Sequence, residues 1–179
     1  SPAVADDVAA LLAKGDVVAF VQGRFEWGPR ALGHRSLLAL PTPLAVKERL
    51  NRVIKRREPF RPFAPAVLEA DASRFFGPFA LRLAPFMVTV ADVREDAKPV
   101  LEAVTHVDGT ARVQTVLPST PFGALIDAVG RQTGTPVVLN TSLNGKSEPI
   151  VASVADAFAF FLGHSADALV VEDVLIRKS

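Results

Sequence analysis

Apolar and polar positions along the chain follow two different spacings, and the longer one predicts helices. Apolar residues recur every three or four positions in four stretches: 4–12, 44–54, 122–129 and 154–162. This spacing places the apolar side chains on one face of a helix. Gly15 and Gly134 are placed to end the first and third stretches, and Ser153 is a favourable N-cap for the last. The pattern therefore predicts four amphipathic helices, with a further short helical turn over residues 71–75.

Short apolar runs between these stretches predict buried strands. They cover residues 17–21, 37–40, 66–68, 86–90, 112–116 and 136–139, and a closing hairpin joins 169–171 to 175–176. Prolines exclude a regular helix from residues 57–65, because each lacks an amide donor and pushes its predecessor into extended geometry. Helices and strands do not alternate strictly. We therefore predict an α+β fold with a mixed, twisted β-sheet flanked by helices.

Composition limits both the size of the domain and its chemistry. The chain has 179 residues, of which 49% are hydrophobic, enough for a single domain over residues 1–179. Cysteine is absent, which excludes disulfides and thiolate chemistry. The three histidines lack the spacing of metal ligands, so we expect no metal site. No apolar run reaches transmembrane length and no signal peptide is evident, so we expect a soluble, cytoplasmic domain that does not bind membranes.

The net charge is nearly neutral, but its distribution is uneven. The formal charge of +1 is too small for a protein that coats nucleic acid through its overall charge. Between Lys47 and Arg61, however, seven basic residues stand against two acidic ones. This excess keeps a basic nucleic-acid-binding module as a hypothesis, which would show a steep salt dependence. The near-neutral total and the few interleaved aromatic residues argue against nucleic acid as a partner.

One segment, Gly23 to Ser36, combines three arginines with three glycines between two predicted strands. Arg24, Arg30 and Arg35 offer forked donors that suit phosphate or carboxylate groups. The glycines allow the backbone to turn sharply and to approach a ligand closely. A solvated basic loop is the alternative, but the apolar runs on both sides favour a segment held between buried strands. We predict that this arginine loop binds an anion.

Other polar side chains lie close to the ends of predicted elements. Lys55 and Arg61 flank the start of the proline-rich segment, and Asn140 and Ser142 follow the strand 136–139. Cations combined with amides and hydroxyls suit a phosphorylated ligand. The sequence contains no GxxxxGK[ST] loop, no GxGxxG fingerprint and no GxSxG elbow. This favours catalysis by positioning and charge stabilisation, without a covalent intermediate on a side chain.

Simpler interpretations of the same residues stay open. Asn140 and Ser142 could be turn residues in a loop over 140–145, and Lys55 could extend its ammonium into solvent. Four other basic side chains between Lys47 and Arg61 are expected on a solvated helix face: Arg49, Arg52, Arg56 and Arg57.

Five separated motifs resemble one family, in the same order along the chain. They are GRFEWGPRALGHRS from residue 23, IKRREPFRPFAP from residue 54, APFM from residue 84, THVDGTARVQTV from residue 105 and NTSLNGKSEPIV from residue 140. Together they resemble the C-terminal domain of the O-carbamoyltransferases that act on nodulation factors and antibiotics, over nearly the whole chain. The resemblance implies a YrdC-like fold.

The same resemblance implies a reaction and its participants. Carbamoyl phosphate and ATP, with Mg²⁺, would give carbamoyl adenylate and pyrophosphate as a first half-reaction. An N-terminal Kae1-like domain with a histidine-bound metal would then pass the carbamoyl group to a hydroxyl acceptor. That domain is absent from this sequence, so it is the expected partner, in cis or in trans, alongside small-molecule substrates.

By motif position the resemblance also implies roles for single residues. Lys55 and Arg61 would be catalytic, and they would bind the phosphates of carbamoyl phosphate and ATP together with Arg30 and Arg112. The nucleotide or the carbamoyl end would be held by Asn140 and Ser142. Arg24 and Arg35 are further binding candidates, for which supporting roles are also possible, as for Glu26.

One departure from the family pattern raises a third hypothesis. The family usually reads Ala-Asp-Pro-Arg where this chain has Ala39-Leu40-Pro41-Thr42, so an acid and a base are lost together. If the two pair with each other, their joint loss is nearly neutral, which the apolar Leu40 favours. If they contact Mg²⁺ or phosphate, the chain is a catalytically degenerate domain that only docks on its partner.

Overall fold

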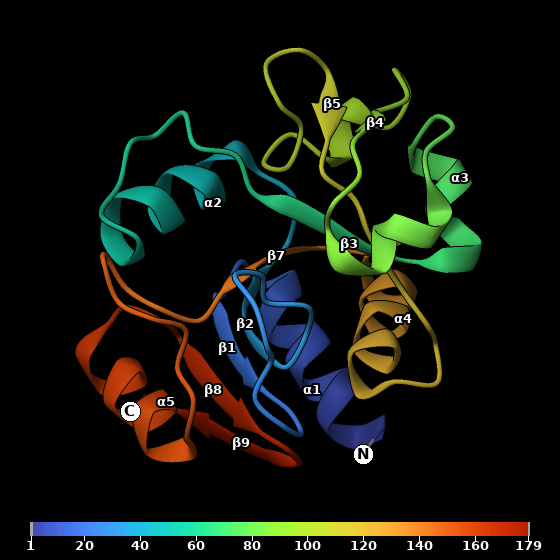
Figure 1. Ribbon diagram of the computed structural model, residues 1–179. Coiled ribbons are helices and arrows are strands. Elements are labelled where there is room, and N and C mark those ends of the chain that lie inside the picture. The colour runs from blue at the N-terminus through green and yellow to red at the C-terminus, as the bar shows by residue number, and fades with distance from the viewer. Residues whose placement is uncertain (1, 179) are drawn as a thin grey trace.

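The structure, a computed structural model, describes residues 2–178, which place helices on both faces of one central sheet (Figure 1). The α-helices are α1 (Pro2–Ala13), α2 (Leu44–Arg49), α3 (Ala72–Phe75), α4 (Pro121–Thr133) and α5 (Val154–Gly163). The strands are β1 (Val18–Val21), β2 (Arg35–Ala39), β3 (Ala64–Leu68), β4 (Ala91–Asp92), β5 (Thr110–Ala111), β6 (Gln114–Val116), β7 (Val137–Ser142), β8 (Ala168–Val171) and β9 (Val174–Arg177). Short 3₁₀ helices cover Glu69–Asp71, Leu81–Phe86 and Lys98–Val100, and a π-helical turn, Leu50–Ile54, continues α2.

Seven strands form the central sheet in the order β6-β3-β7-β2-β1-β8-β9. β1 pairs with β8 and β3 with β6 in parallel, while the other neighbours are antiparallel. The sheet is therefore mixed, and the predicted α+β class is confirmed. The register of β2 against β7 sets Ser36 opposite Ser142 and Leu38 opposite Asn140. This pairing brings the end of the arginine loop beside the polar end of β7.

The sheet separates two hydrophobic cores, because side chains alternate between its faces. On one face α1 and α4 pack together over buried residues such as Leu12, Phe20 and Ile126. On the other face α5, the π-helical turn and the segment from α3 to β5 enclose Leu139 and Phe160 (Figure 1). Both faces are covered, which explains why most strand residues are buried even where the strand is short.

The ends of the longer helices carry the caps that the sequence predicted. The Ser153 hydroxyl accepts from the backbone N–H of Asp156 at 3.1 Å, and the Asp156 carboxylate accepts from the N–H of Ser153 at 2.8 Å. This reciprocal capping box satisfies donors that the first turn of α5 leaves unpaired. Gly134 ends α4 with a left-handed backbone at φ 77°.

The predicted strand over residues 86–90 is wrong. Leu81–Phe86 forms a 3₁₀ helix that contains Pro85, and Met87 then adopts a left-handed φ of 54°. Val88 and Val90 remain 61% and 54% exposed, so this apolar run is not buried in a sheet, as a strand of this composition would be. Apolar composition alone could not distinguish an exposed apolar segment from a buried strand.

Two other boundaries differ from the sequence prediction. The loop expected from residue 140 begins later, because β7 continues to Ser142 and pairs with β2. The strand expected over 112–116 begins only at Gln114, as β6, and Arg112 lies between β6 and β5. The polar side chains of Asn140 and Ser142 favour a loop in a local pattern, although the neighbouring strand β2 completes their backbone hydrogen bonds.

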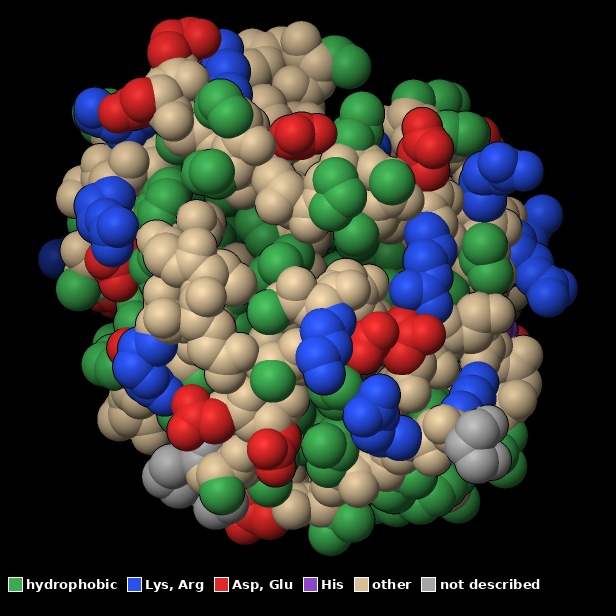
Figure 2. All heavy atoms as spheres, turned by 180° about the vertical axis from the view of Figure 1, so that it is seen from behind, with side chains coloured by type: hydrophobic (Ala, Val, Ile, Leu, Met, Phe, Trp, Pro, Cys, Tyr) green, Lys and Arg blue, Asp and Glu red, His purple; other side chains and the backbone are tan. Residues whose placement is uncertain are grey.

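The surface mixes charges of both signs. On the face seen in Figure 2, basic and acidic side chains lie interspersed between hydrophobic and neutral ones. This face does not present the continuous basic stripe on which a nucleic-acid backbone would lie. Each helix within residues 2–178 is too short or too polar to span a bilayer.

Replacing Ser153 by Ala should lower the free energy of unfolding by about 1 kcal/mol, because the first turn of α5 loses its side-chain acceptor. Urea unfolding followed by circular dichroism would measure the change. Ser119→Ala is the matched control, since Ser119 lies in an exposed loop outside any capping box. An unchanged unfolding midpoint in Ser153→Ala would contradict the stabilising role of the cap.

Candidate functional site

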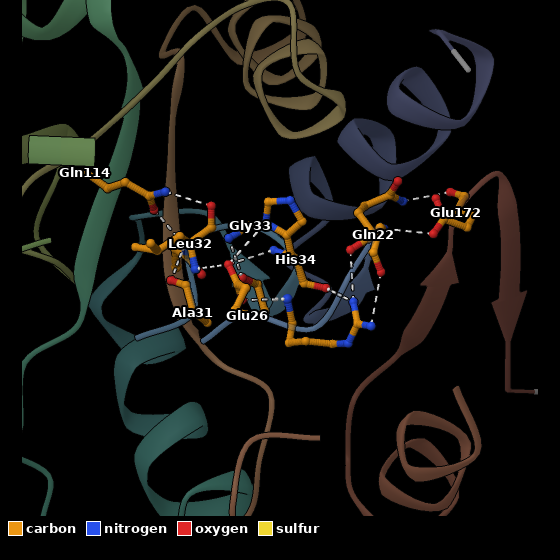
Figure 3. Close-up of polar contacts among 12 residues, drawn as sticks. Gln22, Glu26, Ala31, Leu32, Gly33, His34, Gln114 and Glu172 are labelled. Carbon is orange, nitrogen blue, oxygen red and sulfur yellow. Dashed lines mark hydrogen bonds and ion pairs between the residues drawn. The ribbon is translucent and has the colours of Figure 1, made fainter. Parts of the chain in front are cut away.

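The arginine loop joins β1 to β2 and is folded around one carboxylate. Glu26 accepts hydrogen bonds from the backbone N–H groups of Leu32 at 2.6 Å, His34 at 3.2 Å and Arg35 at 3.0 Å. Its side chain is only 8% exposed, and it also contacts Nδ1 of His34 (Figure 3). The Glu26 carboxylate thus accepts hydrogen bonds from three backbone amides that would otherwise be unpaired in the loop.

Arg35, the first residue of β2, anchors the end of this loop. Its guanidinium donates to the carbonyls of Gln22 and His34 at 2.9 Å, Gly23 at 3.1 Å and Ala152 at 3.2 Å. The residue is 5% exposed. Because all three of its nitrogens already bind backbone oxygens, this guanidinium has a structural environment and does not face a cavity.

Two side-chain amides fasten the other end of the loop to the sheet. Gln114 donates to the carbonyl of Leu32 at 2.8 Å, and Asn140 donates to the carbonyl of Ala31 at 3.0 Å and to Gln114 Oε1 at 2.8 Å. Figure 3 shows the side chain of Gln114, the first residue of β6, reaching Leu32 in the loop. These bonds hold Arg30, the residue before Ala31, over the end of β7.

Three arginines converge on a small cavity of about 90 Å³. They are Arg30, Arg57 and Arg112, and the described residues that line this cavity include no Asp or Glu. Burial and the charges of Arg30 and Arg57 lower the pKa of Arg112. The cavity therefore concentrates positive charge without a compensating carboxylate, which is the condition for binding an anion.

Two buried polar atoms beside this cavity have no hydrogen-bond partner within residues 2–178: Arg112 Nε, a donor, and Asn140 Oδ1, an acceptor. Buried polar atoms are nearly always paired, so such a pair calls for an explanation. A ligand that offers both an acceptor and an N–H donor would satisfy them together.

A larger cavity of about 430 Å³ adjoins the first. Its lining includes four basic residues besides Arg57, two acidic residues and several polar ones: Lys55, Arg56, Arg61, Lys146, Glu58, Glu148, Ser142, Asn144 and Ser147. The two cavities share Arg57 and Ser142. Arg56 and Ser147, which both line this cavity, have left-handed backbones at φ 44° and 58°. Non-glycine residues in that conformation are strained, and such strain concentrates at functional sites.

Lys55 is buried in the wall of the larger cavity, beside Ser142, which both cavities share. Its ammonium donates to the carbonyls of Ser142 and Asn144 and, at 2.7 Å, to Asn144 Oδ1. The pKa of Lys55 is lowered to about 7, chiefly by burial and also by the nearby charge of Arg57, while Glu148 opposes both effects. A lysine in this state becomes a full cation most readily when an anion binds beside it.

Six of the eight candidate binding and catalytic residues from the sequence meet here. Arg30, Arg112, Asn140 and Ser142 line the small cavity, while Lys55, Arg61 and again Ser142 line the larger one. Arg24 is exposed and lines neither cavity, and Arg35 is buried in the loop anchor. The prediction treated the three arginines of the loop alike, but in the structure only Arg30 lines a cavity of the site.

Arg57 was assigned to a solvated helix face, and that assignment is wrong. The helix ends before it, so Arg57 lies over the ring of Phe63 at 4.8 Å and lines both cavities. Its position at the start of the proline-rich segment was the available signal, because prolines exclude helix there. Asn144, which binds Lys55, was also not singled out, since its contact depends on a long-range approach.

Comparisons with known proteins agree with this architecture. The family described as Carbamoyltransferase C-terminus matches residues 9–178. Nodulation protein NolO of Bradyrhizobium diazoefficiens is 51% identical over 178 residues, covering 98% of this chain and 32% of that protein. The 3'-hydroxymethylcephem-O-carbamoyltransferase of Amycolatopsis lactamdurans is 40% identical over 176 residues, covering 97% and 33%. The chain spans about a third of the length of these two relatives.

Solved structures with low sequence identity show the fold. Full-length HypF in a phosphate- and nucleotide-bound form aligns with a TM-score of 0.63 at 17% identity, over 93% of this chain and 20% of that one. E. coli YciO aligns with a TM-score of 0.60 at 14% identity, over 99% and 88%. These alignments confirm the predicted YrdC-like fold.

Glu26→Ala should loosen the arginine loop, because three backbone amides lose their acceptor. Hydrogen exchange is expected to accelerate at the amides of Leu32 and Arg35, while the strand amides of β8 keep their protection. Glu26→Gln, which retains one carbonyl acceptor, should give an intermediate effect. Unchanged exchange in Glu26→Ala would show that the loop does not depend on this carboxylate.

Lys55 should titrate near pH 7, whereas exposed lysines titrate near 10.5. Lysine-selective NMR would follow it. We expect Glu148→Gln to lower this pKa further and Arg57→Gln to raise it, because their charges act in opposite directions. The unfolded chain binds the proton more strongly, so the contribution of Lys55 to the free energy of unfolding increases from about pH 7 to 10.5. A Lys55 pKa near 10.5 would contradict the effect of burial.

Proposed function

The chain belongs to the carbamoyltransferase C-terminus family, and from this premise we propose that it forms carbamoyl adenylate and pyrophosphate from carbamoyl phosphate and ATP. The observation that carries the proposal is the pair of adjoining cationic cavities, which share Arg57 and Ser142. A reaction between two phosphorylated substrates needs two anion sites in contact. The relative that is named an O-carbamoyltransferase supports carbamoyl transfer as the overall chemistry.

The two cavities differ in size, which suggests an assignment of the substrates. The larger, about 430 Å³ and lined by Lys55, Arg61 and Lys146, suits the phosphates of ATP. The smaller, about 90 Å³, suits the carbamoyl group and its phosphate. There Asn140 Oδ1 would accept from the carbamoyl NH₂ and Arg112 Nε would donate to an oxygen, so both unpaired atoms gain partners.

The proposed chemistry balances without a covalent bond to the protein. Water cleaves carbamoyl phosphate to carbamate and inorganic phosphate. A carbamate oxygen then attacks the α-phosphorus of ATP, the bond to the β-phosphate oxygen breaks, and pyrophosphate leaves. Negative charge accumulates on the phosphate oxygens in both steps. Arg30, Arg57 and Arg112 on one side, with Lys55 and Arg61 on the other, would stabilise that charge by fixed position.

Mg²⁺ would enter with the nucleotide. Within residues 2–178 no group of three or more His, Asp or Glu side chains is arranged to hold a metal. Mg²⁺ commonly binds through substrate phosphates and a few protein oxygens. Neither cavity provides a cage made of protein carboxylates, so the ion's ligands would come mainly from the ATP phosphates and water.

The second half-reaction would belong to a partner. Because the relatives are about three times as long, we propose that carbamoyl adenylate passes to a Kae1-like domain that holds a metal through histidines and transfers the carbamoyl group to a hydroxyl. Leu40 and Thr42, which depart from the family pattern, line neither cavity. Leu40 packs against the core under α1 and α4, which favours a structural role over a catalytic one.

An ATP–pyrophosphate exchange assay that requires carbamoyl phosphate tests the proposal. Lys55→Ala and Arg61→Ala should each reduce exchange by about 10²-fold or more, because each removes a charge that faces the transferred phosphates. Arg94→Ala is the matched control, since Arg94 forms a surface pair with Asp96. Correctly folded protein without exchange would exclude autonomous activity. Retained affinity for a partner domain would then favour the docking role, and salt-sensitive binding of polynucleotide would favour the nucleic-acid role.

A further inference from the structure

We propose that Asn51 is a positioning residue, which fixes the guanidinium of Arg57 between the two cavities and sets the path of the loop that carries Arg61. Its importance for catalysis rests on the proposed function, but the placement of Arg57 can be tested without any substrate. Neither the sequence motifs nor the family match singles out this asparagine as part of the site. Its role follows from the contacts of its side chain.

Asn51 is fully buried in the π-helical turn that continues α2. Its side-chain oxygen accepts from Arg57 Nε at 2.8 Å, and its nitrogen donates to the carbonyls of Pro59 and Arg61, both at 3.1 Å. Its backbone carbonyl also accepts from the N–H of Arg57 at 3.0 Å. Both amide donors and the amide acceptor are therefore used by one loop, residues 57–61.

These bonds leave the two terminal nitrogens of the Arg57 guanidinium available to bind an anion. Nε is held by Asn51 and the guanidinium plane lies over Phe63 at 4.8 Å. Within residues 2–178 the two terminal nitrogens of Arg57 make no hydrogen bond, and the residue lines both cavities. Holding a guanidinium by Nε and by its face fixes its direction while two donors remain free for an anion.

The site needs such a restraint because its charges repel. Burial lowers the pKa of Arg57, and the neighbouring charge of Arg61 lowers it further, while Glu58 opposes both. Without an attachment, a long side chain in this field would turn toward solvent. Asn51 supplies the attachment with a neutral oxygen, whereas a carboxylate there would cancel the positive charge that the cavities offer to an anion.

The geometry also explains why the side chain is an amide. An aspartate could still accept from Arg57 but could not donate to the carbonyls of Pro59 and Arg61. Two backbone oxygens would then face a negative charge in a buried place, which is unfavourable. The π-helical turn, an uncommon conformation that recurs at functional sites, places Asn51 toward the loop.

Arginine-selective NMR of the ligand-free protein gives the first test. We expect a sharp, slowly exchanging Nε–H signal for Arg57 that disappears in Asn51→Ala and shifts in Asn51→Asp. The Nε–H of Arg35, which donates to the Ala152 carbonyl, should persist and report an intact fold. Gln132→Ala is the matched control, because Gln132 also donates its amide to a backbone carbonyl, far from the cavities. An unchanged Arg57 signal in Asn51→Ala would overturn the proposal.

A double-mutant cycle on pyrophosphate binding, measured by calorimetry, gives the second test. Asn51→Ala and Arg57→Ala should each weaken binding by about tenfold, and the double variant should lose clearly less than the product of the two losses, because Asn51 acts mainly through Arg57. A small loss beyond Arg57→Ala would report the displaced loop that carries Arg61. If the affinity losses of the two single variants multiplied in the double variant, Asn51 would not act through Arg57 and the proposal would be overturned. If wild-type protein did not bind pyrophosphate, the proposed function would fail while the NMR test would still decide the positioning role.

Arg57→Lys covers the case in which Asn51→Ala does not fold. This variant keeps the charge but has no guanidinium to fix through Nε. The proposal expects its pyrophosphate affinity to fall as far as in Arg57→Ala. Wild-type affinity in Arg57→Lys would show that a fixed guanidinium is not needed, and would overturn the positioning role of Asn51.

Discussion

Several positively charged side chains lie close together beside the end of β7, and they repel one another. Contacts with the surrounding structure must therefore hold each of them in place. Arg30, Arg57 and Arg112 share one small cavity, and Lys55 lines the larger cavity that adjoins it. Burial and neighbouring cations lower the pKa of Lys55, Arg57 and Arg112, which shows how costly the arrangement is. A stable fold that retains such a cluster must secure each group individually.

The means of attachment are mostly neutral oxygens. Lys55 is held by backbone carbonyls and an asparagine, Arg57 by the amide of Asn51, and Arg35 by four backbone carbonyls. Neutral acceptors fix direction but leave the net charge in place, whereas carboxylates would cancel it. The one carboxylate at the centre of the arginine loop, Glu26, binds backbone amides instead of the cavity arginines. The result is a preorganised positive potential directed at two cavities.

Sheet pairing brings these groups together although they are far apart in sequence. β2 and β7 run antiparallel, so the end of the arginine loop meets Ser142, and the amides of Gln114 and Asn140 fasten the loop to β6 and β7. The π-helical turn then delivers Lys55 and the proline-rich segment to the same place. The proposed adenylate chemistry would need this convergence, because it relies on position and charge and uses no side-chain nucleophile.

The sequence by itself determined the type of most elements, the mixed α+β class and the segments that carry the chemistry. Hydrophobic spacing is local, and it located the helices, the buried strands and the Ser153 cap. Arginine, lysine and amide side chains at the ends of apolar runs located the candidate site. Five motifs sufficed for the family resemblance, and the comparisons confirm it.

Only the tertiary structure decided which polar groups face the cavities. Arg30 and Arg35 look equivalent in the sequence, yet Arg30 lines a cavity and Arg35 binds four carbonyls, because Arg35 begins β2 whereas Arg30 lies in the loop before it. Arg57 joined the site, and residues 86–90 formed no strand, since both outcomes depend on packing partners remote in sequence. Burial and hydrogen-bond partners are properties of the assembled chain, so no local pattern contains them.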